Sequence, residues 1–132
     1  MPAKLRAVRG ATTLEEDSPE QVDARVRELV AEMIERNDLD RDALVSILLT
    51  ASPDVRSAFP ASAARRMGLD DVPVLGAQEL DVAGATPLCI RVMMHVETER
   101  ARADVDHVYL HGAQGLRDRA GLGAGGAAGR QP

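Results

Sequence analysis

Three stretches of the chain alternate apolar and polar residues with the period of a β-strand. In residues 88–96 every second residue is apolar, which predicts a strand with one face in the core. Residues 4–10 and 107–111 alternate in the same way. Within residues 4–10, Arg9 shares a face with two apolar residues, so we expect Arg9 near the rim of the core.

Two further strands are predicted where the pattern is less regular. Residues 44–50 form a continuous apolar run that ends shortly before Pro53, which is typical of a short buried strand. Residues 72–81 begin with apolar residues on both sides of Pro73. Proline donates no backbone hydrogen bond and therefore favours the edge of a sheet. The sequence thus predicts five strands.

One long segment has the spacing of an amphipathic helix. Apolar residues recur every three or four positions over residues 22–34. Ser18 is the predicted N-cap, with Pro19 in the first turn and Gln21 completing a capping box. Asn37 is predicted to end the helix, because asparagine tolerates the left-handed conformation at that position.

A second, shorter helix is predicted over residues 60–67, with Gly68 as its stop signal. Five strands and two helices in mixed order predict an α+β fold, a mixed β-sheet with helices on one face. The other face would be open in a monomer, so we expect an oligomer. We expect a single domain over residues 1–119 and a disordered Gly/Ala-rich tail over residues 120–132, which cannot bury enough apolar surface to fold.

Composition and charge exclude several classes of partner and location. A net charge of −5 and an aromatic content of 2% argue against a general nucleic-acid or anionic-membrane surface, so we expect neither partner. The single cysteine excludes an internal disulfide and fits a reducing compartment. Neither a signal peptide nor an apolar run long enough to span a bilayer is visible, which indicates a cytoplasmic protein.

The polar face of the predicted strand 88–96 carries Arg91 between Cys89 and Met93. A buried arginine without an anionic partner would cost about 3–5 kcal/mol. The partner is either an acidic side chain, for which Glu79 is the obvious candidate, or a bound anionic ligand. The pattern leaves both interpretations open.

Other kinds of catalytic chemistry lack a recognisable pattern. His107 and His111 are four residues apart, and on a strand this spacing separates them by roughly 13 Å, too far to share a metal ion. Cys89 has no histidine that can be tied to it as a base. The glycine-rich residues 121–129 lack the lysine and helix that follow a phosphate-binding loop.

Five motifs follow one another along the chain. They are VRGATTLEEDSPE (8–20), TASPDVRSAFPASAAR (50–65), VPVLGAQELDV (72–82), CIRVMM (89–94) and HVYL (107–110). In this order they resemble the small, trimeric, monofunctional chorismate mutases. The resemblance implies a homotrimer in which the sheets form a pseudo-α/β-barrel, with active sites at the subunit interfaces. It implies an isomerase that rearranges chorismate to prephenate in the shikimate pathway, on the branch to phenylalanine and tyrosine, without cofactor or metal.

The resemblance also implies roles for individual residues. Arg91 would contact the ether oxygen of chorismate and a carboxylate, and Glu79 would accept a hydrogen bond from the ring hydroxyl. Gly76 and Ser62 depart from the family, because many members have cysteine and lysine there. The remaining roles are Arg9 and Tyr109 at the substrate carboxylates, Phe59 and Arg65 contributed by the neighbouring subunit, and Leu116 and Arg117 in a segment that closes over the pocket.

Two rival functions are compatible with a trimer of this kind. One is a small-molecule binding or regulatory protein that has lost the catalytic rate. The other is an enamine/imine deaminase of similar architecture, which also uses an interface arginine. The combination of Arg9, Glu79, Arg91 and Tyr109 favours the mutase, because a binding protein has no reason to keep an arginine at the ether oxygen.

Overall fold

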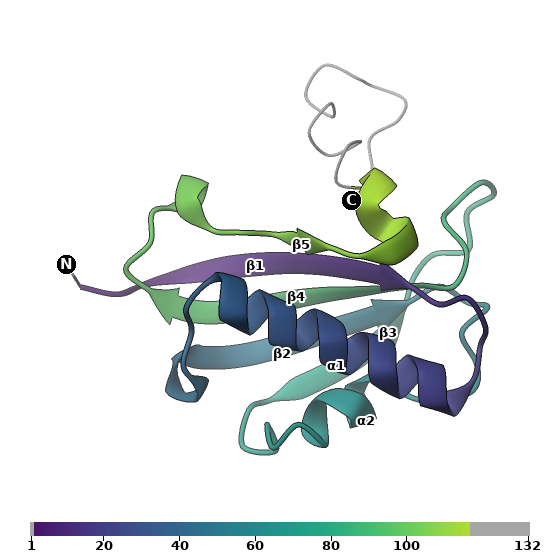
Figure 1. Cartoon of the computed structure of the whole chain (residues 1–132), viewed down its shortest axis with the longest axis horizontal. Coiled ribbons are helices and arrows are strands. Elements are labelled where there is room, and N and C mark those ends of the chain that lie inside the picture. The colour runs from purple at the N-terminus through teal and green to yellow at the C-terminus, as the bar shows by residue number, and fades with distance from the viewer. Residues whose placement is uncertain (1, 117–132) are drawn as a thin grey trace.

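The computed structural model describes residues 2–116, and both Arg117 and the predicted tail 120–132 lie outside these residues. Five strands form one mixed sheet, which confirms the α+β prediction (Figure 1). Among residues 2–116 no helix has the length and apolar character needed to cross a membrane. The strands are β1 (Lys4–Thr13), β2 (Leu44–Ala51), β3 (Val74–Gln78), β4 (Cys89–Thr98) and β5 (Val108–Tyr109).

The order of strands in the sheet is β3-β2-β4-β1-β5. The central strand β4 runs antiparallel to both of its neighbours, β1 and β2. The outer strands are parallel to theirs, β3 to β2 and β5 to β1. The edge position predicted from Pro73 is confirmed, because β3 begins one residue after it and pairs with β2 only.

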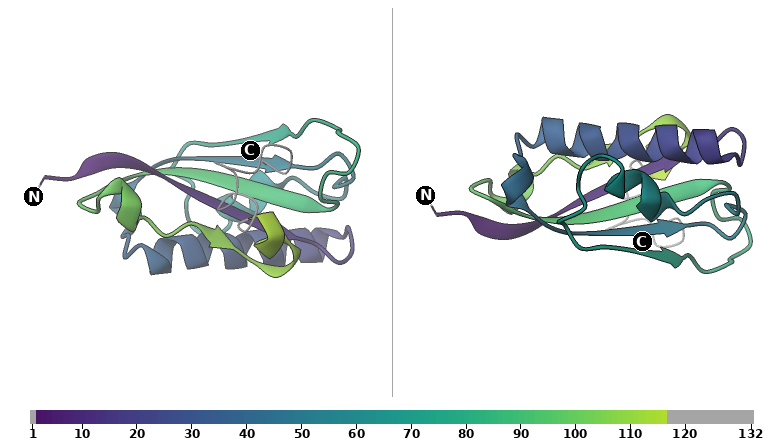
Figure 2. Two further views of the ribbon diagram at one scale, coloured as in Figure 1. Left: turned by 90° about the horizontal axis from the view of Figure 1, so that it is seen from above. Right: turned by 90° about the horizontal axis from the view of Figure 1, so that it is seen from below.

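Both helices cover the same face of the sheet (Figure 2). Helix α1 (Pro19–Arg36) connects β1 to β2, and α2 (Pro60–Arg65) connects β2 to β3. Each connection joins two parallel strands and advances in the same direction across the sheet. Crossovers of the same hand and direction place their helices on the same face, so the opposite face is left open.

The core lies between α1 and the inner face of β1, β2 and β4. Gly10 allows the helix to approach β1 closely, because a Cβ atom at this position would lie 2.5 Å from Met33 Sδ. Burial of each large side chain contributes about 1.5–3 kcal/mol. The largest fully buried side chains are those of Leu29, Met33, Ile47, Leu49, Ile90 and Met94.

Both ends of α1 differ in detail from the prediction. Ser18 caps the helix and accepts the Gln21 N–H at 3.2 Å, as predicted. The Gln21 side chain, however, accepts the N–H groups of Glu15 and Glu16 rather than that of Ser18, so the reciprocal capping box is not formed. At the C-terminus the left-handed residue is Asp38, at φ 51°, and not Asn37, at φ −106°.

The open face of the sheet carries Arg9, and the expectation that Arg9 lies at the rim of the core is wrong. Leu5 and Ala7, which share its face, are exposed, whereas the buried Val8 points towards α1. Leu48 on β2 and Leu75 on β3 pair in register on this open face and are 38% and 66% exposed. Alternation along β1 identified the two faces but not which of them the helices cover.

The last strand is shorter than residues 107–111, because His111 has a left-handed backbone at φ 53° and begins a 3₁₀ turn, His111–Ala113. His107 Nδ1 accepts the backbone N–H of Arg9 at 3.0 Å, and His111 Nε2 lies 2.9 Å from Glu28 Oε1. The two histidines therefore contact different elements. Among residues 2–116 no group of three or more His, Cys, Asp or Glu side chains is placed to hold a metal ion.

Asn37 connects the end of α1 to the segment that leads into β5. Its side-chain amide donates to the carbonyls of Met33 and Asp106, each at 2.9 Å, and its carbonyl accepts the Asp106 N–H at 2.8 Å. Asn37 is only 3% exposed, so water cannot replace these partners. This contact fixes the chain three residues before Tyr109.

We predict that Asn37→Ala lowers the free energy of unfolding by about 1–3 kcal/mol, because the buried Met33 carbonyl and the partly buried backbone groups of Asp106 lose their partner. Urea denaturation followed by circular dichroism measures this change. The control is Glu35→Ala, an exposed residue in the same turn, which should change stability by less than about 0.5 kcal/mol. Equal effects of the two substitutions would contradict the proposed role of Asn37.

Candidate active site

A pocket of about 200 Å³ lies on the open face of the sheet and brings together four of the predicted site residues. Arg9 comes from β1, Arg91 from β4, Tyr109 from β5, and Glu79 from the residue directly after β3. These four residues are far apart in sequence, and the strand order is what brings them into one pocket. The other side chains on this face that line it are those of Ala11, Leu48, Thr50 and Met93.

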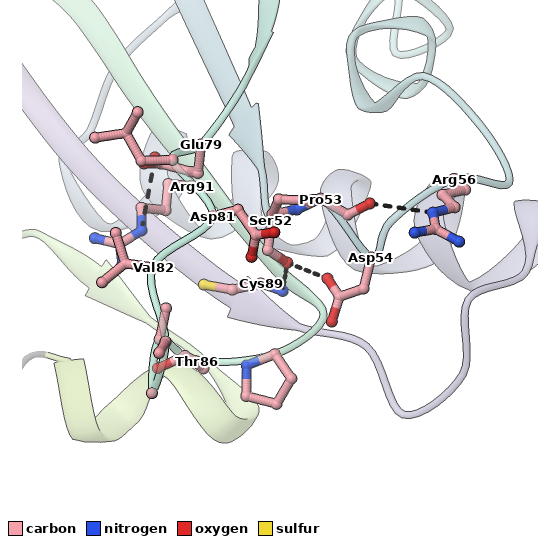
Figure 3. A pocket seen from close by; sticks show the side chains of 15 residues that line it. Ser52, Pro53, Asp54, Arg56, Glu79, Asp81, Val82, Thr86, Cys89 and Arg91 are labelled. Carbon is pink, nitrogen blue, oxygen red and sulfur yellow. Dashed lines mark hydrogen bonds and ion pairs between the residues drawn. The ribbon is translucent and has the colours of Figure 1, made fainter.

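Arg91 has an acidic partner within the chain and also faces the pocket. Its Nε atom lies 3.8 Å from Glu79 Oε2, which is an ion pair but longer than a hydrogen bond (Figure 3). The same Glu79 oxygen accepts the Thr50 hydroxyl at 2.6 Å. Thr50 lies opposite Arg91 in the β2–β4 register, so the two strands hold both partners of the carboxylate in place. The alternatives of an internal carboxylate and a ligand therefore need not exclude each other.

Cys89 and Leu116 form a small apolar cluster on the open face beside Arg91. The cluster also contains Ala11 and Ala113, and Tyr109 packs against it. Burial raises the pKa of the Cys89 thiol, and the nearby Arg91 guanidinium opposes this rise by its charge and a hydrogen bond. Cys89 therefore stays a neutral thiol at neutral pH, which argues against a nucleophile. Leu116 is 4% exposed and is part of this cluster, but it does not line the 200 Å³ pocket.

Phe59 and Arg65 do not reach this pocket. They line a second hollow, of about 720 Å³, beside α2 and the helix-facing side of β2 and β3. Phe59 is 79% exposed, and Arg65 makes only a long contact of 3.4 Å with the Val74 carbonyl. A single chain therefore carries two separate groups of predicted site residues on opposite faces of its sheet.

Gly76 belongs to this second hollow and not to the surroundings of Glu79. A Cβ atom at Gly76 would lie 3.8 Å from Ala61 Cβ, on the side of α2. Residues 75, 77 and 79 alternate to the open face, so Gly76 faces away from Glu79 within one chain. A side chain lost at Gly76 therefore affects the hollow that contains Phe59 and Arg65. Ser62 lines the same hollow.

The pocket-lining residues Leu48, Thr50 and Met93 were not predicted as site residues. The sequence does show that they occupy alternating positions, but it does not show that β2 and β4 are neighbours. Thr50 is the most important of them, because its hydroxyl orients Glu79. Knowledge of the β2–β4 register would have been sufficient to find all three.

The chemistry of the pocket defines a class of site. It presents two guanidinium groups, one carboxylate and one phenol, together with apolar side chains, and its described residues include no nucleophile paired with a base. Such a set can bind a small anion through arginine, position a hydroxyl against the carboxylate and stabilise developing negative charge. These are the requirements of an enzyme that catalyses by binding and electrostatics, without a covalent intermediate.

The chain belongs to the chorismate mutase type I family, whose family model matches residues 5–120. It is 42% identical over 114 residues to the chorismate mutase AroH of Thermus thermophilus, covering 86% of this chain and 93% of that protein. It is 41% identical over 114 residues to the chorismate mutase AroH of Bacillus subtilis (strain 168), covering 86% and 90%. The solved structure of a chorismate mutase from Clostridium thermocellum matches with a TM-score of 0.82 and 44% identity, over 83% of this chain and 98% of that chain.

The family resemblance seen in the five motifs is thus confirmed. The protein is an enzyme, a chorismate mutase of the isomerase class. The comparisons favour this function over a binding or regulatory protein and over a deaminase.

We predict that Thr50→Val lowers kcat/KM by about tenfold, because Glu79 loses a charge-assisted hydrogen bond while the shape of the site is kept. Steady-state kinetics with chorismate measures the change. Thr50→Ser is the matched control, since it retains the hydroxyl, and it should stay within about threefold of the natural enzyme. If Thr50→Val is as active as Thr50→Ser, the hydroxyl does not orient Glu79.

Proposed function

We propose that chorismate binds in the pocket formed by Arg9, Glu79, Arg91 and Tyr109. The observation that carries this proposal is the convergence of these four side chains, from β1, β4, β5 and the residue directly after β3, on one pocket. Arg91 acts at the ether oxygen and a carboxylate, and Arg9 and Tyr109 bind the substrate carboxylates. Glu79, held by Thr50, accepts a hydrogen bond from the ring hydroxyl.

The rearrangement of chorismate to prephenate is pericyclic, so the enzyme needs neither a nucleophile nor a general base. Its tasks are to hold a flexible dicarboxylate in the reactive chair form and to stabilise charge on the oxygen of the breaking ether bond. Arginine suits both tasks, because its planar fork binds carboxylates and its charge is permanent. The central strand β4 fixes the backbone of Arg91 on both sides, by pairing with Ala11 and Thr50.

We further propose that the enzyme is a homotrimer and that each active site is completed by a neighbouring subunit. The pocket of about 200 Å³ shares Glu79 and Arg91 with a hollow of about 650 Å³, and neither is lined by Phe59 or Arg65 of the same chain. The exposed leucines Leu48 and Leu75 leave an apolar area on the same face that a second subunit can cover. Phe59 and Arg65 of the neighbour then wall the pocket and attract a carboxylate.

Two coarser features of the protein are also part of the proposal. We place the enzyme in the cytoplasm, because its single cysteine is a buried free thiol and fits a reducing compartment. We take residues 1–119 as one catalytic domain, which agrees with a family match that ends at residue 120. The closing role of Leu116 and Arg117 stays a prediction.

We predict that Arg91→Ala lowers kcat by about 10²-fold or more, because the transition state loses its main positive charge. The assay follows the loss of chorismate absorbance in the ultraviolet, and the natural enzyme must exceed the uncatalysed rate in buffer. Arg91→Lys is the matched variant that keeps the charge and loses the planar fork. Near-full activity of Arg91→Lys would contradict the geometric role, and loss of the oligomer in Arg91→Ala would favour a structural role.

We predict that two inactive variants restore activity when their subunits are mixed. Arg91→Ala damages the pocket on the open face, whereas Arg65→Ala damages the hollow beside α2. After partial denaturation and refolding of an equal mixture, subunits exchange at random. A site is intact only when its open-face pocket comes from an Arg65→Ala subunit and its α2 hollow comes from an Arg91→Ala subunit, so roughly a quarter of the sites should be intact. Failure of exchanged trimers to gain activity would show that both residues act within one subunit.

A further inference from the structure

Asp54, in the loop after β2, binds the beginning of β4 directly and through Ser52 (Figure 3). Asp54 Oδ1 accepts the Ser52 hydroxyl at 2.5 Å, and Oδ2 accepts the backbone N–H of Leu88 at 2.9 Å. The Ser52 hydroxyl oxygen in turn accepts the N–H of Cys89 at 2.9 Å. The Ser52 backbone N–H donates to the Cys89 carbonyl at 2.9 Å. Asp54 and Ser52 thus hold consecutive backbone groups at the point where β4 begins.

This point of the chain is strained. Leu88 has φ 47°, in the left-handed region that a leucine rarely occupies and that costs roughly 1 kcal/mol or more. Its N–H is bound by Asp54, and its carbonyl accepts the Leu14 N–H at 2.8 Å. The two bonds fix the peptide groups on both sides of Leu88 and so fix the direction in which the chain enters β4.

Arg91 lies two residues after Cys89, on the same face of β4. Cys89 and Arg91 both point to the open face, and Cys89 is 3% exposed beside the guanidinium. The contacts therefore continue from Asp54 through Ser52 and Cys89 to Arg91. Asp54 lies outside the 200 Å³ pocket, but with Ser52 and Cys89 it lines a hollow of about 650 Å³ that shares Glu79 and Arg91 with that pocket (Figure 3). The mechanism proposed for the pocket assigns no task to Asp54.

We propose that Asp54 and Ser52 are positioning residues for Arg91. They fix the direction in which the chain enters β4 and the position of Cys89, beside which the Arg91 guanidinium lies. The orientation of Arg91 in the pocket depends on both. The inference rests on the proposed role of Arg91. A displacement of about 1 Å in a catalytic group can cost as much as 10²-fold in rate, so a small change at this turn is sufficient to be measured.

Asp54→Ala and Ser52→Ala should each lower kcat about tenfold and change KM by less than about threefold, because the defect falls on the group that acts in the transition state. Asp54→Asn should recover most of the rate. Its amide oxygen can accept the Leu88 N–H and its NH₂ group can donate to the Ser52 oxygen, so geometry is kept while the charge is lost. An Asp54→Asn variant as slow as Asp54→Ala would overturn the positioning role.

A double-mutant cycle separates action through Arg91 from general damage. In an Arg91→Ala background Asp54→Ala should have less than about a twofold effect on kcat, because the group that it positions is gone. The same tenfold loss in both backgrounds would overturn the proposal. A hundredfold slower enzyme stays measurable, since enzymes accelerate reactions by about 10⁶-fold or more.

Asp42→Ala is the matched control, because it removes an exposed carboxylate from the 3₁₀ turn before β2 and should leave the kinetics unchanged. Thermal unfolding and size determination of every variant identify those that fail to assemble. If Asp54→Ala fails to assemble, Ser52→Ala and Asp54→Asn provide the test.

The outcomes for Arg91 and Asp54 distinguish the two proposals. If Arg91→Ala itself retains full activity, the proposed function of the pocket fails. If Arg91→Ala is slow and Asp54→Ala is not, only the positioning inference fails.

Discussion

The pairing of β4 with strands on both of its sides is the constraint on which the rest of the structure depends. Residues 89–98 pair with the whole of β1, and residues 90–96 pair with β2. The backbone of Arg91 is therefore fixed from both sides, in a strand whose inner face carries Ile90, Val92 and Met94 at the centre of the core. Displacement of Arg91 would require disruption of this core. The sheet provides the preorganisation that electrostatic catalysis needs.

The one-sided cover of helices determines where the site can lie. Both crossovers advance in the same direction, so α1 and α2 share a face and the opposite face is free for Arg9, Glu79 and Arg91. The same free face exposes Leu48 and Leu75, which are costly to leave in water. In the proposed trimer, binding of substrate and association of subunits share this one surface.

Most of the fold follows from local patterns, whereas the site depends on contacts between strands. Alternation predicted three strands and helical spacing predicted α1, because one face of each of these elements is buried at least in part. The apolar run 44–50, the residues around Pro73 and the stop signal at Gly68 predicted β2, β3 and α2. The same patterns could not tell which face of β1 the helices cover, so Arg9 was expected at the rim of the core. They also missed Thr50, whose importance comes only from its register with Arg91. The difference at Gln21 depends on which backbone N–H groups its side chain reaches, and those at the end of α1 and at His111 depend on backbone angles that single residues do not determine.

The Arg91–Glu79 pair shows how a charged site can be stable both with and without its ligand. The Glu79 carboxylate is bound most closely by the Thr50 hydroxyl, at 2.6 Å, and lies 3.8 Å from Arg91 Nε. At that separation the ion pair offsets part of the cost of a guanidinium whose side chain is 21% exposed. Because Thr50 holds Glu79 in place, the carboxylate can keep its position when an anion binds at the proposed site, and the proposed action of Arg91 on the substrate then needs little reorganisation.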